Sequence, residues 1–160
     1  MSFMDEVNLR DVPPEGQFLV EIKLPEAGFI VEAKGKGKLD EGVKGYKLQF
    51  VILEPAEVED LVFFQSYYVG TNDDHKADDL ATWKGAKNFG AKSLIKLLKA
   101  AQVALPSTPD ETDDAVRRLA GQRLMVKTKN KESDGYENVN INKYEMIGGL
   151  APQITDPTWK

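Results

Sequence analysis

Two runs of alternating residues lie between positions 46 and 70, in the sequence YKLQFVILEPAEVEDLVFFQSYYVG. Successive side chains of a β-strand point to opposite faces, so this pattern predicts two strands joined by a short acidic loop. Both faces of each strand carry large apolar side chains. The stretch also holds six aromatic residues, which are Tyr46, Phe50, Phe63, Phe64, Tyr67 and Tyr68. One face is expected to be core, and the other is either a second core or an exposed aromatic surface.

Alternation of the same kind predicts further strands at residues 17–24, 28–33, 121–129 and 138–146. Asp134-Gly135 lies between the last two strands and is a strong hairpin signal. Apolar residues at helical spacing predict a helix over residues 91–103, and a shorter helix is expected over residues 111–120. The chain is thus expected to be mainly β, with one longer and one short α-helix inserted before a C-terminal hairpin.

The length of 160 residues predicts one domain with a real hydrophobic core. Residues 1–16 contain Pro13-Pro14 and are expected to be a flexible arm. Residues 17–147 form the expected domain. Residues 148–160 have little periodicity and are expected to be a poorly ordered tail.

Several classes of protein are disfavoured by composition. The chain has no cysteine and one histidine, His75, so a thiolate or multi-histidine metal site is excluded. No apolar stretch is long enough to cross a membrane, and the acidic start lacks the apolar region of a signal peptide. A reducing, cytoplasmic setting is therefore expected. No nucleotide-binding or catalytic motif occurs, so we expect neither an enzyme nor a bound cofactor.

Charge is distributed unevenly along a chain of net charge −5. Residues 84–99 contain five lysines and residues 117–131 contain six basic residues, and neither segment contains an acid. A local basic surface can bind phosphate even on an acidic protein, because salt screens charges beyond about 8–10 Å. The helix at 91–103 carries Lys92, Lys96 and Lys99 opposite its apolar stripe, and such a face is also typical of plain solvent exposure.

Four aspartates between residues 73 and 79 raise the question of a cation site. Their spacing does not match a calcium-binding loop, and helix capping by Asp78 or Asp79 is the alternative use. His75 is expected to be a surface residue rather than a catalytic base.

The order of early strands, helix and final hairpin is compatible with a β-barrel of the OB-fold type. Such barrels bind single strands across the second and third strands, between two flanking loops. In this sequence those positions correspond to the aromatic hairpin, to the glycine-lysine loop at residues 34–44 and to the hairpin tip at residues 127–136.

Three segments carry a resemblance to a known family: YYVGTNDDHKADDLATWK, GAKSLIKLLKAAQV and LAGQRLMVKTKNKESDGYENVNINKY. Over roughly residues 15–147 the chain resembles small OB-fold single-stranded-DNA-binding and replication or recombination accessory proteins of tailed bacteriophages. The resemblance implies an OB fold, sequence-tolerant binding of single strands, no enzymatic activity and the cytoplasm of a bacterial host. Many such proteins end in a long acidic tail, whereas this chain ends in ITDPTWK, with Asp156 as its one acid.

The leading hypothesis is therefore a non-enzymatic single-stranded-DNA binder, with phage replication or recombination proteins as further partners and a homo-oligomer as one arrangement. Phosphate contacts are expected from Lys34, Lys36, Lys38, Lys47, Arg123, Lys127 and Lys129. Faces for bases are expected from Tyr46, Phe64, Tyr68 and Tyr136. Two alternatives stay open: a structural or protein-interaction module of a virion or accessory protein, and a metal-dependent nuclease that uses the acids at 73–79.

Overall fold

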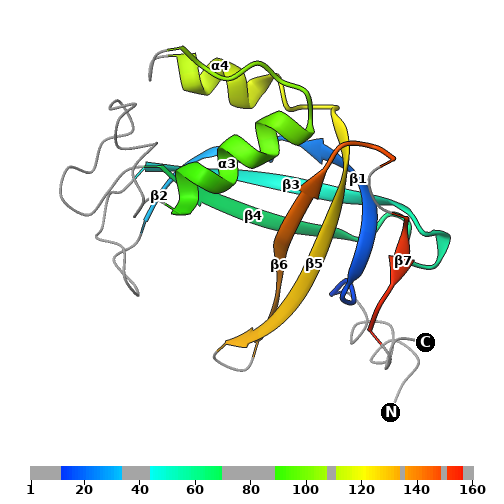
Figure 1. Ribbon diagram of the computed structural model, residues 1–160. Helices are drawn as coiled ribbons and strands as arrows, with labels where there is room; N and C mark the ends of the chain where they lie inside the picture. The colour runs from blue at the N-terminus through cyan, green and yellow to red at the C-terminus, as the bar shows by residue number, and fades with distance from the viewer. Residues whose placement is uncertain are drawn as a thin grey trace.

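The computed structural model describes residues 12–33, 44–69, 89–107, 111–133, 136–148 and 151–156. The described strands are β1 (Gly16–Lys23), β2 (Ile30–Glu32), β3 (Lys44–Glu54), β4 (Val62–Tyr68), β5 (Arg123–Ser133), β6 (Tyr136–Glu145) and β7 (Gln153–Ile154). Two helices, α3 (Phe89–Ala100) and α4 (Thr112–Arg117), precede the β5–β6 hairpin (Figure 1). The mainly β fold with a longer and a shorter helix before the final hairpin is confirmed.

All seven strands belong to one antiparallel sheet. Its main order is β2-β3-β1-β5-β6, with β4 paired to β3 and β7 paired to β1. The hairpin of β5 and β6 crosses the β3–β4 pair steeply (Figure 1). This order places β1 at the centre of the sheet, between β3 and β5.

The expected barrel is not closed by a strand ladder among the described residues. The two edge strands, β4 and β6, approach each other, and a side chain joins them. Gln65 donates a hydrogen bond from Nε2 to the carbonyl of Val139, and its Oε1 accepts one from the Ile141 amide at 3.4 Å. The prediction of a β-barrel is thus corrected to an open sheet whose seam between β4 and β6 is bridged by side chains, among them the Gln65 amide.

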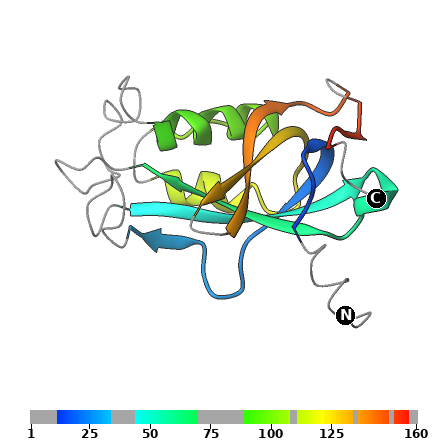
Figure 2. The same cartoon turned by 90° about the horizontal axis from the view of Figure 1, so that it is seen from below.

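The core lies between the inward faces of the strands and the apolar side of α3. Buried side chains of α3 include Ala91, Leu94, Leu97 and Leu98, as the helical spacing predicted. The helix contacts both β4 and β6 and so covers the open end of the sheet. Figure 2 shows α3 on one side of the molecule and β2 on the opposite side, with β3 and β4 between them.

Element boundaries differ slightly from those predicted. The longer helix ends at Ala100 rather than Val103, because Gln102 has a positive φ of 61° and turns the chain. The shorter helix covers Thr112–Arg117 only. The two strands predicted between residues 46 and 70 are β3 and β4, and the four further predicted strands correspond to β1, β2, β5 and β6, each within a few residues.

Both ends of the chain contribute more order than expected in the part that is described. Pro13 and Pro14 of the predicted arm are buried, and the Glu15 carboxylate accepts a 2.8 Å hydrogen bond from the Asn130 amide. In the predicted tail, β7 pairs with Gly16 and Gln17 of β1. Two-residue pairing of this kind leaves no periodic signal in the sequence.

Candidate nucleic-acid interface

The β3–β4 hairpin resolves into one buried and one partly exposed face. Tyr46, Phe50, Phe63 and Tyr67 point inward and are all at most 5% exposed. Phe50 and Phe63 stack with ring centroids 5.2 Å apart. Phe64 points outward and is 45% exposed. Four of the six aromatic rings are therefore core, and the outward pair is Phe64 and Tyr68.

We call the second surface the β3–β4 outer face, and its residues include Lys47, Gln49, Val62, Phe64, Ser66 and Tyr68. Antiparallel register sets Lys47 opposite Ser66 and Gln49 opposite Phe64. The Lys47 ammonium reaches diagonally to lie 4.9 Å from the centroid of the Phe64 ring. A cation beside an exposed ring combines a phosphate contact with a stacking surface.

The Tyr68 ring packs over Gly45, its cross-strand neighbour on β3. A Cβ at Gly45 would come within 2.6 Å of the Tyr68 ring, so any larger residue would push the ring away. The missing side chain therefore fixes where one of the two outer rings lies. This contribution of Gly45 was not predicted from the sequence, where the residue reads only as the end of a glycine-rich loop.

A second glycine, Gly90, lets the start of α3 lie against the backbone of β4. A Cβ at Gly90 would lie 1.9 Å from the Tyr68 carbonyl oxygen, so only glycine lets the helix begin against the backbone of β4. The buried leucines of α3 pack in the same core as the inward side chains of the hairpin. The helix therefore lies on the inward side of the hairpin, and the β3–β4 outer face points away from it.

The expectation that Tyr46 offers a face to bases is wrong, because this residue is 0% exposed. Its hydroxyl donates a 2.6 Å hydrogen bond to Asp113 of α4, and Lys44 forms a 3.1 Å ion pair with the same carboxylate. Burial raises the pKa of Tyr46 well above its ordinary value, and the bond to Asp113 adds to this effect. Tyr46 thus attaches α4 to β3, and the alternation pattern alone did not show that its face of the strand is the core face.

Asp113 is the charged member of this cluster. Partial burial opposes its ionisation, but hydrogen bonds from Tyr46 and Lys44 outweigh burial, helped by the charges of Lys44 and Arg117. The net result is a pKa below the ordinary value of 3.8. The carboxylate is therefore ionised at neutral pH and serves the attachment of α4 to the sheet.

A tyrosine pair lies at the seam between β4 and β6. The hydroxyls of Tyr67 and Tyr144 are 2.7 Å apart. Burial raises the pKa of both phenols, to about 12 for Tyr144. Both phenols remain neutral in the physiological range, so the contact joins β4 to β6 as a hydrogen bond between two neutral hydroxyls.

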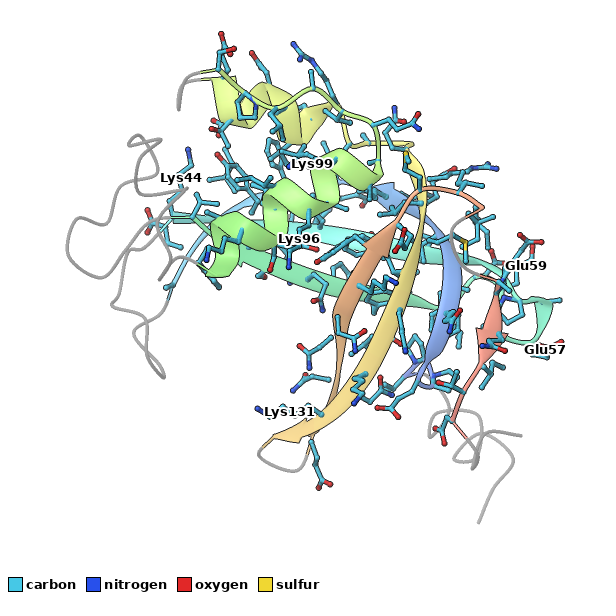
Figure 3. All side chains as sticks on the ribbon, in the orientation of Figure 1. Lys44, Glu57, Glu59, Lys96, Lys99 and Lys131 are labelled. Atoms are coloured by element: carbon cyan, nitrogen blue, oxygen red, sulfur yellow. The ribbon has the colours of Figure 1, made fainter. Side chains whose placement is uncertain are left out.

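The predicted basic residues of β5 lie apart from the β3–β4 outer face in the sheet order, separated from β3 by β1. Arg123 forms a 3.1 Å ion pair with Glu21 of the neighbouring strand β1. Lys127 and Lys129 alternate outward, and Lys131 follows near the hairpin tip (Figure 3). The structure therefore joins Lys47, Phe64 and Tyr68 on one surface and carries the hairpin lysines on a separate arm.

The remaining predicted contacts fall outside the described residues. These are Lys34, Lys36 and Lys38, and the side chain of Tyr136, whose backbone alone is described in β6. His75 and the aspartates at 73–79 lie outside as well. In the described part of the chain, acidic and histidine side chains form no group that could hold a metal ion. No helix among the described residues is long and apolar enough to cross a membrane.

No protein-family model and no curated protein matches the sequence. The candidate interface therefore rests on the exposed rings, the neighbouring lysine and the topology of the sheet. The alternation within the strands and the order of strands and helices along the chain were predicted from the sequence. The burial of Tyr46 and the seam residue Gln65 were not, because both faces of the hairpin carry apolar residues and Gln65 occurs on a strand as an ordinary polar residue.

Proposed function

We propose that this protein binds single-stranded DNA without strong sequence preference and without catalysing a reaction. The β3–β4 outer face would provide Phe64 and Tyr68 as stacking surfaces, and Lys47 would contact the phosphate backbone. The observation that carries the proposal is the 45% exposure of Phe64 together with the Lys47 ammonium 4.9 Å from its ring.

An aromatic residue held open on a sheet surface is informative because its neighbour in sequence, Phe63, is buried. Covering an exposed ring removes apolar area from water, worth about 25 cal/mol per Å². Stacking of one base on a protein ring is worth about 1–3 kcal/mol, and every base offers a π-face. Rings of this kind therefore favour single strands over duplexes, whose bases are already stacked, and they do so without reading sequence.

The lysines of the β5–β6 hairpin support the same proposal. Lys127, Lys129 and Lys131 lie on the hairpin that corresponds to one of the flanking loops in OB-type barrels. Charges on such an arm would hold the backbone of a strand that crosses the β3–β4 outer face. A role in phage DNA replication or recombination, with other proteins of those processes as partners, rests on the resemblance of the sequence alone.

The proposal is tested by fluorescence anisotropy of labelled oligo-dT and of a duplex of equal length, across a series of salt concentrations. We expect preference for the single strand and affinity that falls with salt, by about 0.7 in log K per log unit of salt for each phosphate neutralised. Absence of oligo-dT binding at low salt would overturn the proposal and favour a protein-interaction module. Magnesium-dependent nicking of the DNA would instead favour the nuclease alternative.

A further inference from the structure

A groove runs between the C-terminal half of α3 and the end of β6. Its volume is about 420 Å³, and its lining includes Lys96, Lys99, Asn142, Lys143, Tyr144 and Met146. A second depression of about 370 Å³ shares Ala100 and Met146 with the first and continues to Ile147. Figure 3 shows Lys96 and Lys99 on α3, and both lysines line the first hollow. The two hollows together form an extended surface rather than a single compact pocket.

The groove is locally positive on a chain of net charge −5. Lys96, Lys99 and Lys143 line it, against one carboxylate, that of Glu145. Glu145 is engaged with Lys143 at 3.1 Å. Lys96 and Lys99 are exposed along one side of α3. An occupant with carboxylates would therefore meet two ammonium groups along one edge of the groove.

The residues that follow β6 contribute exposed apolar side chains to the two hollows. Met146 and Ile147 are 52% and 62% exposed, which makes them the most exposed large hydrophobic residues of the described chain. Methionine side chains are flexible and polarizable, so they accommodate apolar partners of different shapes. Two adjacent exposed apolar side chains give an apolar surface that a partner protein could cover.

A nucleic-acid strand fits this groove less well than a peptide does. The ring at the site is Tyr144, which is partly buried, and its hydroxyl lies 2.7 Å from that of Tyr67. It therefore offers little open face on which a base could stack. The β3–β4 outer face, by contrast, points away from α3, so the groove is a separate surface of the molecule.

We propose that the groove between α3 and β6 binds an extended acidic segment of a partner protein, with apolar side chains between its carboxylates. The apolar side chains would pack on Met146 and Ile147, and the carboxylates would pair with Lys96 and Lys99. Because the groove and the β3–β4 outer face point in different directions, a partner could be held while DNA is bound.

The test is a titration of the full chain with a 12-residue fluorescein-labelled peptide in which aspartate alternates with leucine and phenylalanine. A control peptide carries lysine in place of each aspartate, and a second carries serine in place of each apolar residue. We expect anisotropy to rise with the first peptide only. In two-dimensional NMR spectra, the amides of Met146 and Ile147 should shift, whereas those of Phe64 and Ser66 should not.

Matched variants separate this inference from DNA binding. The double substitution Lys96→Glu and Lys99→Glu should weaken peptide binding by about tenfold or more and change oligo-dT affinity by no more than about twofold. Lys129→Glu with Lys131→Glu should do the reverse. If the charge reversal disturbs α3, the pair Lys96→Gln and Lys99→Gln should still weaken peptide binding by a few fold.

Three outcomes would overturn the inference. The acidic peptide could fail to shift any resonance at millimolar concentration, or it could bind equally to the lysine-reversed protein. Oligo-dT could instead shift the amides of Met146 and Ile147, in which case the groove belongs to the DNA path. Loss of oligo-dT binding with peptide binding intact would reject the proposed function and leave this inference standing.

Discussion

Phe63 and Phe64 are adjacent residues of identical chemistry with opposite environments. Phe63 stacks on Phe50 in the core, and Phe64 stands in solvent beside Lys47. The pleat of β4 alone sends the two side chains to different faces. Substitutions at these two adjacent positions can therefore distinguish the effect of an aromatic ring on stability from its effect on binding.

Replacing Phe64 by Ala should lower the affinity for oligo-dT by about 1–3 kcal/mol, or about 5- to 150-fold, because one stacking surface is lost. The free energy of unfolding of the Phe64→Ala protein should differ from that of the natural protein by less than about 1 kcal/mol, since the ring is exposed. Phe63→Ala is the matched control and should cost about 3–5 kcal/mol of stability. Urea unfolding and anisotropy measure the two effects. Destabilisation by Phe64→Ala as large as that by Phe63→Ala would show that Phe64 is a core residue.

Asp113 gives stability that depends on pH. Its folded-state pKa lies below the ordinary value, so the ionised form is favoured in the folded protein. The contribution is therefore present above the unfolded pKa of about 3.9 and is lost as pH falls through the lower folded pKa. At neutral pH, Asp113→Ala should also leave the buried hydroxyl of Tyr46 without its acceptor, at a cost of about 1–3 kcal/mol.

We expect the stability difference between the natural protein and Asp113→Ala to shrink as pH is lowered from about 5 to about 2. Urea unfolding at several pH values measures it. Asp114→Ala is the control, because Asp114 is exposed and pairs with Arg117, itself exposed, at the next turn of the same helix. A difference for Asp113→Ala that stays constant over this range would show that the charge of Asp113 has no part in holding α4.

At the scale of elements, the fold depends on how the edges of the sheet meet. Unpaired edge strands are open to association with other chains. Here β4 and β6 are bridged by the Gln65 amide and by the contact between Tyr67 and Tyr144. Side chains thus take the place of a ladder of backbone hydrogen bonds at this seam.

Gln65→Ala should destabilise the protein by about 1–3 kcal/mol, because it leaves the Val139 carbonyl and the Ile141 amide without this partner. Amide hydrogen exchange should speed up at Ile141 more than at inner strand β1. Gln122→Ala, at an exposed position, is the control and should leave exchange unchanged. Unaltered exchange at Ile141 in the Gln65 variant would contradict the bridging role.

At the scale of the molecule, basic and acidic side chains lie at opposite ends of β3. Lys44 begins β3, whereas Glu57 and Glu59 lie in the loop that follows its other end, and Figure 3 shows them on opposite sides. The acidic loop would repel phosphates at one end of the β3–β4 outer face. A bound strand is therefore expected to lie toward the end of this face that carries Lys47.

Much of this architecture could be predicted from the sequence, because period-two and helical spacing fix the strands and helices directly. The exposed face of the hairpin could not, since Tyr46 and Phe64 lie on faces of similar apolar content. The bridge made by Gln65 joins residues more than 70 positions apart in the sequence. The pairing of β7 with β1 involves two residues of each strand. Neither leaves a periodic signal.

The most direct test of the central claim is photochemical cross-linking of oligo-dT that carries 5-iododeoxyuridine, followed by mapping of the linked peptide by mass spectrometry. This base reacts with aromatic side chains that stack on it. If the β3–β4 outer face binds single strands, cross-links should form at Phe64 and Tyr68 and should fall on Phe64→Ala substitution. Cross-links confined to other parts of the chain, with none on this face, would contradict the claim.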